Sequence, residues 1–293
     1  MEFVSVVIPT YNRGNLIIRA INSVLEQTYS NIEVIVVDDC SSDNTREIVQ
    51  SIKDNRVRYL CLEKNMGACA ARNRGIEASR GEYIAFQDSD DEWHPNKLEV
   101  QMKKMKDAQA DVSFCNFIKV FKNEDKKREF PLDVPEGFIE YESLLKKSIV
   151  STQCIIAKKS CFDEVRFDTN LPRLQDWDVI LELSKKYSVY HVDNALVNMY
   201  VQSDSISSHP EKGVIALKYL WNKNKKQVDN DKEVSYLWNI YLGNYKLACG
   251  ENPSSYYKNA LKIHITRSLI IKYILSKIGI ISIVYRKTGR LER

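Results

Sequence analysis

The sequence predicts an α/β fold: a doubly wound, mostly parallel sheet flanked by helices and followed by a helical extension. Three observations support this prediction. Short apolar runs alternate with stretches of helical periodicity in the first third of the chain, 44% of the 293 residues are hydrophobic without repetitive tracts, and the sequence beyond residue 213 becomes helical and rich in Tyr, Trp and Lys. A chain of this length buries a substantial core.

Strands and helices alternate regularly at the amino end. Residues 4–8 (VSVVI) and 33–37 (EVIVV) are β-branched runs typical of strands covered on both faces. Apolar residues recur at helical spacing between Leu16 and Leu25, so the connection is a right-handed crossover that makes the two strands parallel. The pattern continues with a helix capped by Asp43, a strand over 57–62, a helix over 68–78 and a strand over 83–86.

Beyond residue 106 the alternation loosens. We expect a strand over 112–121, a charged loop over 124–135, a strand over 154–157 and a helix over 176–186.

The loops that follow the first four strands are the candidate ligand site. In doubly wound sheets, ligands bind beyond the carboxyl ends of the strands, which places the loops beginning at Pro9, Asp38, Asn65 and Asp88 along one edge. The first of these loops holds one glycine and lacks the G-x-G-x-x-G pattern, so a dinucleotide such as NAD is disfavoured.

The sequence Asp88-Ser89-Asp90 carries two carboxylates in close succession. In an extended segment, side chains two residues apart point to the same side. Paired carboxylates suit Mg²⁺ or Mn²⁺, which such sites bind together with substrate phosphates. The alternative is an acidic turn before a helix that starts near Pro95, where acids are favourable at the positive end of the helix dipole.

Four successive segments carry a family resemblance: VSVVIPTYNR, VIVVDDCSSDNT, NMGACAARNRGIEASRGEYIAFQDSDD and LQDWDV. Their order and spacing resemble the motifs of family 2 glycosyltransferases, inverting enzymes with the GT-A fold. The resemblance is dense from Phe3 to Trp93 and returns near Asp176. It implies a nucleotide-sugar-binding half over 1–110, an acceptor-binding half over 111–212 and a basic helical extension over 213–293.

The resemblance also implies roles for individual residues. Pro9, Tyr11 and Asp39 would hold the nucleobase, usually uracil, with Asp39 accepting from its imide. Asn65 and Arg72 would close over the base and ribose, Asp88 and Ser89 would contact the donor, and Asp90, with Asp88, would bind the metal. These positions also have structural alternatives. Tyr11 could cap the core, Asn65 could be a helix N-cap, and Arg72 and Arg74 could form a solvated helix face.

Inverting sugar transfer needs a carboxylate that removes the acceptor hydroxyl proton. The resemblance implies Asp176 of QDWD as this base, although Gln175 stands where Glu is frequent. Asp178 is the rival, and a helix would point it away from Asp176. Alternatively, both acids only complement the helix dipole, and Trp177 is a packing residue.

The segment that often holds the diphosphate in such enzymes departs from the family pattern. A Tyr-Arg pair and a His are common there, whereas this chain has Tyr200 followed by Val201. The residues available instead are Ser203, Ser205, Ser207 and His209.

Charge and cysteine content indicate the compartment and partners. Residues 258–293 hold nine Lys or Arg and one acid, and isoleucines from Ile270 to Ile283 lie among them. This tail either packs on the main domain or binds an anionic membrane surface. Seven cysteines without a C-x-x-C pair fit reduced thiols in a cytoplasmic protein. If the basic tail binds the membrane, the protein would be peripheral at the inner face of the cell membrane.

The sequence therefore predicts a metal-dependent glycosyltransferase that uses Mn²⁺ or Mg²⁺. It would move a sugar from a UDP-sugar to a saccharide or lipid-linked oligosaccharide acceptor, in bacterial capsule or O-antigen synthesis. The alternatives are a metal-dependent nucleotidyltransferase, which would release pyrophosphate, and a non-catalytic nucleotide-sugar binding module. A nucleic-acid partner is disfavoured because the candidate site is acidic.

Overall fold

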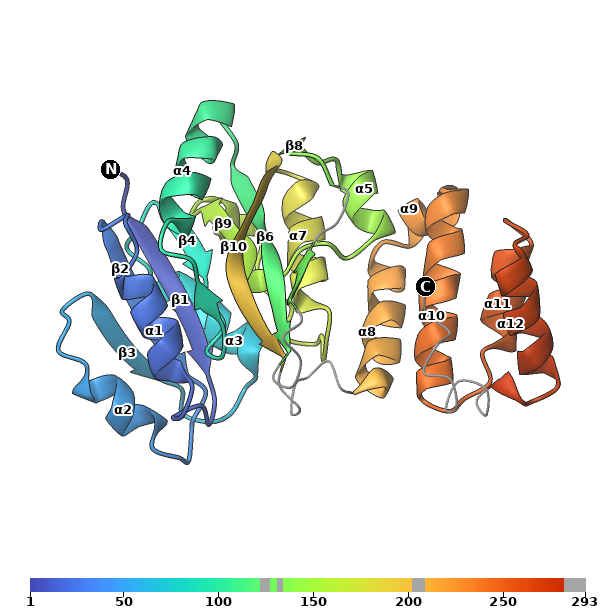
Figure 1. Ribbon diagram of the computed structural model, residues 1–293, viewed down its shortest axis with the longest axis horizontal. Coiled ribbons are helices and arrows are strands. Elements are labelled where there is room, and N and C mark those ends of the chain that lie inside the picture. Colours follow the sequence, from blue (N-terminus) through green and yellow to red (C-terminus); the bar gives the residue numbers. More distant parts are fainter. Residues whose placement is uncertain (122–126, 131–133, 202–208, 282–293) are drawn as a thin grey trace. The chain divides into compact units, whose positions relative to one another are not determined.

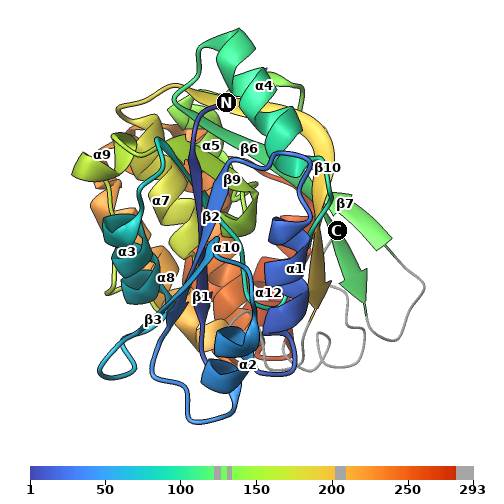
Figure 2. The same ribbon diagram turned by 90° about the vertical axis from the view of Figure 1, so that its left-hand side faces the viewer.

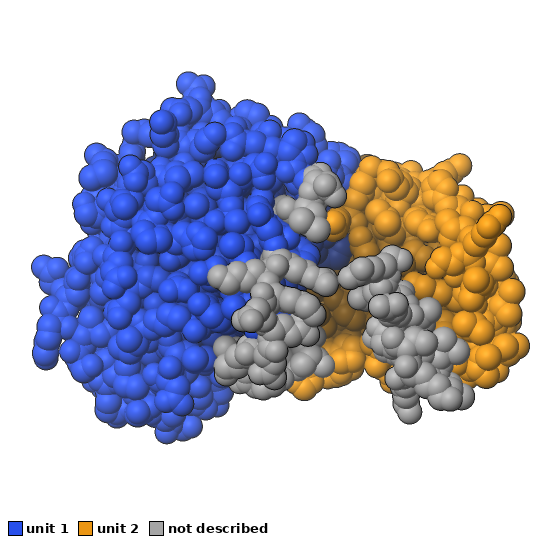
Figure 3. Space-filling model, viewed as in Figure 1, with its two compact units in different colours: residues 1–144, 148–170, 175–202 blue, residues 145–147, 171–174, 203–293 orange. Residues whose placement is uncertain are grey.

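The computed structural model describes residues 1–121, 127–130, 134–201 and 209–281. The chain forms two compact units, coloured separately in Figure 3. Unit 1 comprises residues 1–144, 148–170 and 175–202, and unit 2 comprises residues 145–147, 171–174 and 203–293.

Unit 1 is built on a mixed sheet whose described strands run in the order β3-β2-β1-β4-β9-β6-β10-β5, with β7 paired to β6 and β8 to β10 (Figure 1). The strands are β1 (Val4–Thr10), β2 (Ile32–Asp38), β3 (Val57–Cys61), β4 (Tyr83–Phe86), β5 (Glu92–Trp93), β6 (Val112–Phe121), β7 (Lys127–Phe130), β8 (Gly137–Phe138), β9 (Ile155–Lys158) and β10 (Val189–Val201). The strands β1 to β4, β6 and β10 share one direction, and the others run opposite to them.

Helices cover both faces of this sheet, and Figure 2 shows α1 and α3 on opposite sides of it. The helices are α1 (Ile17–Leu25), α2 (Thr45–Ser51), α3 (Ala68–Ala78), α4 (Lys97–Ala108), α5 (Tyr141–Lys146), α6 (Cys161–Glu164) and α7 (Gln175–Ser184), with a 3-10 turn at Thr152–Cys154. The last residues of α5 belong to unit 2.

The predicted α/β architecture is confirmed. The structure differs from the prediction in strands that are antiparallel or polar. The prediction of a loop over 124–135 is wrong for Lys127–Phe130, because these residues form β7, which pairs with β6. The sequence analysis did not anticipate β10, whose pairing with β6 is interrupted by register shifts between Val192 and Val197. Such bulges break the period-two pattern by which a strand is identified.

The parallel strands explain where a ligand site can form. Every residue of β1 and of β2 is buried, as their continuous apolar runs predict. All strands of the shared direction end at one edge, here called the carboxyl rim. The strand order reverses between β1 and β4, and ligands of doubly wound sheets bind at this point of reversal.

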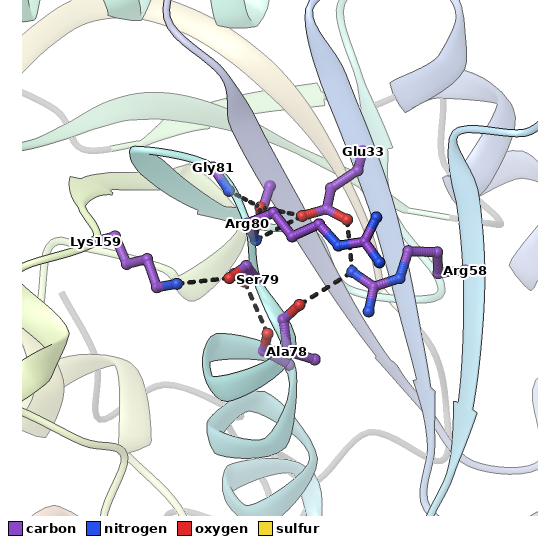
Figure 4. A network of polar contacts seen from close by, with 9 residues as sticks. Glu33, Arg58, Ala78, Ser79, Arg80, Gly81 and Lys159 are labelled. Atoms are coloured by element: carbon purple, nitrogen blue, oxygen red, sulfur yellow. Dashed lines mark hydrogen bonds and ion pairs between the residues drawn. The ribbon is translucent and has the colours of Figure 1, made fainter.

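The opposite edge of the sheet is held by the buried carboxylate of Glu33 (Figure 4). Its Oε1 accepts hydrogen bonds from Ser5 Oγ and the Arg80 N–H, both at 2.7 Å, and its Oε2 accepts from Arg58 Nη1 at 2.6 Å. Although burial opposes ionisation, these donors hold the pKa of Glu33 below its ordinary value. Gly81 lets the chain approach here, since a Cβ on it would lie 2.6 Å from the Ser5 nitrogen.

The regular secondary structure described for unit 2 is helical. Its helices are α8 (Pro210–Lys223), α9 (Lys225–Asn230), α10 (Lys232–Ala248), α11 (Ser254–Leu261) and α12 (Arg267–Lys277). The Asp231 carboxylate caps α10 by accepting from the N–H groups of Glu233 and Val234. In the described parts of the chain, every helix is too short or too polar to cross a membrane.

Candidate functional site

The loops after β1 and β2 are joined by hydrogen bonds at the carboxyl rim. Asn12 adopts a φ of 51°, its N–H donates to Ser41 Oγ at 2.8 Å, and its Oδ1 accepts from the Ser42 N–H at 2.8 Å. Pro9 is buried in β1, while Tyr11 is 46% exposed. The alternative that Tyr11 caps the core is therefore excluded, and its ring is accessible at the rim.

The two adjacent acids at the end of β2 have different surroundings. Asp38 accepts a hydrogen bond from the Tyr59 hydroxyl at 2.6 Å, which gives it a structural role. The two carboxylate oxygens of Asp39 accept from the N–H groups of Met66 and Gly67, each at 2.7 Å. Each oxygen keeps a further lone pair, so Asp39 fixes the loop before α3 and can still accept from a ligand.

Two of the structural alternatives for the β3–α3 region have clear outcomes. Asn65 is exposed and does not cap α3, because Gly67 occupies the N-cap position. Arg74 pairs with Glu77 at 3.2 Å on a solvated helix face, whereas Arg72 is only 6% exposed.

Arg72 joins three segments of unit 1. Its Nη2 donates to Asp88 Oδ1 at 2.7 Å, its Nη1 donates to Gln175 Oε1 at 3.2 Å, and its guanidinium carbon lies 5.4 Å from the centre of the Phe167 ring. The Nε atom is buried without a partner among the described residues. Arg72 therefore connects α3, the acidic segment after β4 and the start of α7.

The segment Asp88 to Asp91 is a turn rather than an extended strand, and Glu92 begins β5. The Asp91 N–H donates to the Asp88 carbonyl at 3.2 Å, so the period-two argument for a shared side does not apply. The carboxylates nevertheless interact. Burial, reinforced by the charge of Asp88, raises the pKa of Asp90 to about 6, while Arg13 and Arg19 act in the opposite direction. Ser89 is buried within the same turn.

Asp91 and Glu92 tie this turn to the end of β10. Asp91 accepts from the Tyr200 N–H at 2.8 Å and from Gln153 Nε2 at 2.7 Å, and Glu92 accepts from the Tyr200 hydroxyl at 2.8 Å. The Arg19 guanidinium lies 3.7 Å from the centre of the Tyr200 ring and donates to the Asp90 carbonyl. Together the side chains of Asp91, Glu92 and Arg19 fix Tyr200 beside the acidic turn.

The carboxylates of Asp88 and Asp90 have the chemistry that a divalent cation requires. No three His, Cys, Asp or Glu side chains of the described residues converge into a complete metal site. A cation that also binds substrate phosphates needs only one or two protein carboxylates. Because Asp88 already pairs with Arg72, Asp90 is the oxygen donor with the larger unmet demand for positive charge. The residues present fit Mg²⁺ or Mn²⁺.

Asp176 lies in the first turn of α7. Burial raises the pKa of Asp176, and the charge of Asp88 raises it further. A hydrogen bond from the Trp177 N–H and the charge of Arg72 act in the opposite direction. Asp176 thus lies within electrostatic range of the Arg72–Asp88 pair. Asp178 is 1% exposed, and Trp177 packs inside and donates from Nε1 to the Leu144 carbonyl at 2.7 Å, which agrees with a packing role.

Sequence reasoning missed Lys119 and Gln153. Burial lowers the pKa of the Lys119 ammonium, while the nearby Asp176 carboxylate opposes the shift. A lone Lys in a strand and a lone Gln in a turn carry no local signal. Of the residues expected around the diphosphate, Ser203, Ser205 and Ser207 lie outside the described residues, as does Ile283 of the tail, and His209 lies 3.1 Å from Glu211.

Comparison with known proteins gives the family. The model of "Glycosyl transferase family 2" matches residues 5–166. A Bacillus subtilis protein named for teichuronic acid biosynthesis, TuaG, is 34% identical over 221 residues, which are 74% of this chain and 85% of TuaG. The Escherichia coli UDP-Glc:alpha-D-GlcNAc-diphosphoundecaprenol beta-1,3-glucosyltransferase WfgD is 31% identical over 261 residues, which are 88% of this chain and 98% of WfgD.

Solved structures agree on the fold. S. aureus TarS 1–349 in complex with UDP-GlcNAc matches with a TM-score of 0.64 and 20% identity, over 99% of this chain and 93% of that one. The mannosyltransferase PcManGT from Pyrobaculum calidifontis, in complex with GDP-Man and Mn²⁺, matches with a TM-score of 0.61 and 17% identity, over 99% of this chain and 88% of that one. The chain therefore belongs to glycosyl transferase family 2 and adopts the GT-A fold.

Proposed function

We propose that this glycosyltransferase moves a hexosyl or N-acetylhexosaminyl group, with inversion, from a UDP-sugar to a lipid-linked saccharide in bacterial surface polysaccharide synthesis. Two relatives support the choice of substrates. WfgD is named for a UDP-glucose donor and a diphosphoundecaprenol-linked acceptor, and TarS binds UDP-GlcNAc. TuaG is named for the synthesis of a surface polysaccharide, teichuronic acid.

In this proposal residues 1–110 bind the donor, and residues 111–212 shape the acceptor site. Tyr11 would lie beside the base, and Asp39 would accept from the base imide. Asn65 and Ser89 would make further polar contacts with the donor. The support is that Tyr11 is accessible and that Asp39 keeps acceptor capacity after binding its two backbone N–H groups.

Asp90, with Asp88, would hold Mn²⁺ or Mg²⁺ against the diphosphate. The bound cation would supply Lewis-acid stabilisation of the charge that develops on the departing nucleoside diphosphate. Arg72 would balance the charge of Asp88 beside it. Burial and the nearby charge of Asp88 raise the pKa of Asp90 to about 6, which supports this assignment because a bound cation would favour the ionised carboxylate.

Asp176 would act as the general base. It would take the proton of the acceptor hydroxyl while the acceptor oxygen bonds to the anomeric carbon, and the bond from that carbon to the diphosphate oxygen would break on the opposite face. The observation that carries the proposal is that Arg72 donates both to Asp88 and to Gln175, the residue directly before Asp176, which brings the start of α7 to the acidic turn. Burial also raises the pKa of Asp176, which makes it a better base.

The acceptor lipid would place the reaction at the cytoplasmic face of the membrane. We propose that the basic carboxyl-terminal part contacts that anionic surface, since residues 258–293 carry nine Lys or Arg and one acid.

The variant Asp176→Asn tests the base. We expect UDP and donor binding to be kept and turnover to fall by about 10²–10⁴-fold, the usual contribution of a general base. Isothermal titration with UDP and steady-state rates on one acceptor measure the two effects. Unchanged turnover would contradict the assignment of Asp176 as the base. UDP binding without any turnover by the parent would instead favour a non-catalytic binding module.

A donor-hydrolysis screen tests the rest of the proposal. UDP-, GDP- and dTDP-sugars are compared with Mn²⁺, with Mg²⁺ and with EDTA. We expect UDP release that needs the cation. Release of pyrophosphate would identify a nucleotidyltransferase instead, and full turnover in EDTA would refute the metal role.

A further inference from the structure

The helix α12, the last that the described part of the chain contains in full, is apolar on two faces. One face of α12 belongs to a core cluster in which Leu247, Tyr257, Leu269 and Ile281 are buried, and Tyr273 packs against it. In Figure 1 α12 runs beside α11, with which it packs. The core of unit 2 therefore uses only one side of α12.

The other side of α12 presents isoleucines to solvent. Ile271 is 56% exposed, Ile274 51% and Ile278 61%. They recur at spacings of three and four residues and so form one line along the helix, here called the isoleucine face. Ile270 on the same helix and Ile280 after its end are also exposed. A surface helix normally places polar residues on its outer face, so this face needs a partner.

The stretch of sequence that contains the isoleucine face carries charges of one sign only. From Lys258 to Lys277 the sequence has five Lys or Arg and no acid. At about 100° of rotation per residue, Lys272 and Lys277 fall on either side of the isoleucine line. Long basic side chains that flank an apolar stripe can lie along it and extend their charges toward anionic groups.

This composition fits a lipid surface better than a protein. Protein interfaces are enriched in aromatic residues, Met and Arg and are depleted in Lys, whereas the exposed large residues of α12 are isoleucines flanked by lysines. Aliphatic side chains with a cationic border are typical of helices that lie in the headgroup region of anionic bilayers.

We propose that the isoleucine face of α12 docks this chain on an anionic lipid bilayer, with Lys272 and Lys277 at the headgroups. The role of this docking rests on the proposed function, because a lipid-linked acceptor would lie at the membrane surface. The docking itself does not depend on catalysis.

Vesicle flotation of the full chain tests this docking. Phosphatidylglycerol–phosphatidylcholine vesicles are compared with pure phosphatidylcholine vesicles at low salt. We expect the parent to partition at least about tenfold more strongly onto the anionic vesicles, and added salt to weaken the binding. The combined variant Ile271→Ser and Ile274→Ser should lose about tenfold or more of this binding.

Matched controls separate docking from misfolding. Ile215→Ser changes an isoleucine of α8 that is 58% exposed in the same unit, and it should float like the parent. The double serine variant should keep the circular dichroism spectrum and melting temperature of the parent, because both positions are exposed. Lys272→Gln with Lys277→Gln should reduce the preference for anionic over neutral vesicles.

Three results would overturn the docking proposal. They are no flotation of the parent with anionic vesicles at low salt, unchanged flotation of the double serine variant, and a dimer in sedimentation that this variant abolishes without any vesicle binding. The inactive Asp176→Asn variant should float like the parent. A failed transferase assay with normal flotation would therefore contradict the proposed reaction and leave the docking proposal standing.

Discussion

Replacing Asp90 by Asn should stabilise the protein in the absence of a cation. The raised pKa of Asp90, about 6 against an ordinary 3.8, means that ionising this carboxyl in the folded state is unfavourable. Each tenfold change in an equilibrium is worth about 1.4 kcal/mol, so the charged form costs the folded state about 3 kcal/mol at pH 7. Asn has the same shape without the charge and removes that cost.

Thermal melting in EDTA measures the stability without a cation, and melting with Mn²⁺ plus UDP measures the stabilisation by ligands. Since about 1 kcal/mol shifts the melting temperature of a medium-sized domain by about 2–4 °C, the variant in EDTA should melt several degrees above the parent. We expect Mn²⁺ and UDP to raise the melting temperature of the parent, and the variant should lose this rise. Asp163→Asn, an exposed acid of α6, should change stability by no more than about 0.5 kcal/mol.

The pH dependence gives a second readout for Asp90. Between pH 3.8 and about 6 the folded state binds a proton at Asp90 that the unfolded state does not, so this group makes the folded state less stable as pH rises through that window. The advantage of Asp90→Asn over the parent should therefore be full near pH 7 and vanish near pH 4. A variant that melts at or below the parent in EDTA, or that still gains stability from Mn²⁺, would refute this reasoning.

Two further substitutions test the network around the site and the opposite edge of the sheet. Asp91→Asn leaves one oxygen to accept from two donors, Gln153 and Tyr200, so kcat/KM should fall about tenfold in steady-state assays, and unchanged kinetics would count against a positioning role. Glu33→Gln removes the charge that pairs with Arg58 and should lower the free energy of unfolding by about 2 kcal/mol in urea at pH 7. Because the folded state lowers the pKa of Glu33, its contribution is present above pH 4.5 and is lost as pH falls below it, so parent and variant should converge in acid.

The sequence was sufficient for the elements whose cause is local. Continuous apolar runs predicted β1 and β2, and helical periodicity with right-handed crossovers predicted the helices between the first strands. The strand β10 was missed because His191, Asn194 and Asn198 interrupt its apolar pattern and bulges break its register. Charged β7 at the edge of β6 was taken for a loop, since edge strands commonly carry charges that discourage further pairing.

The candidate site was predictable as an ordered set of motifs but not as a network. From the order of the motifs, the sequence predicted that Asp39, Arg72, Asp88 and Asp176 belong to one functional site. The contact between Arg72 and Gln175 joins residues 103 positions apart, and no local pattern encodes it. The same holds for the tie of Asp91 to Tyr200, because neither residue's neighbours indicate the partner.

The grip of Asp39 on the N–H groups of Met66 and Gly67 constrains any attempt to change nucleotide preference by grafting. A chimera that takes the end of β2 from another protein, but not the segment before α3, would leave two amide N–H groups without an acceptor or displace the carboxylate. If Asp39 binds the base as proposed, the end of β2 and the segment before α3 must be transferred together, although α2 and β3 lie between them in the sequence.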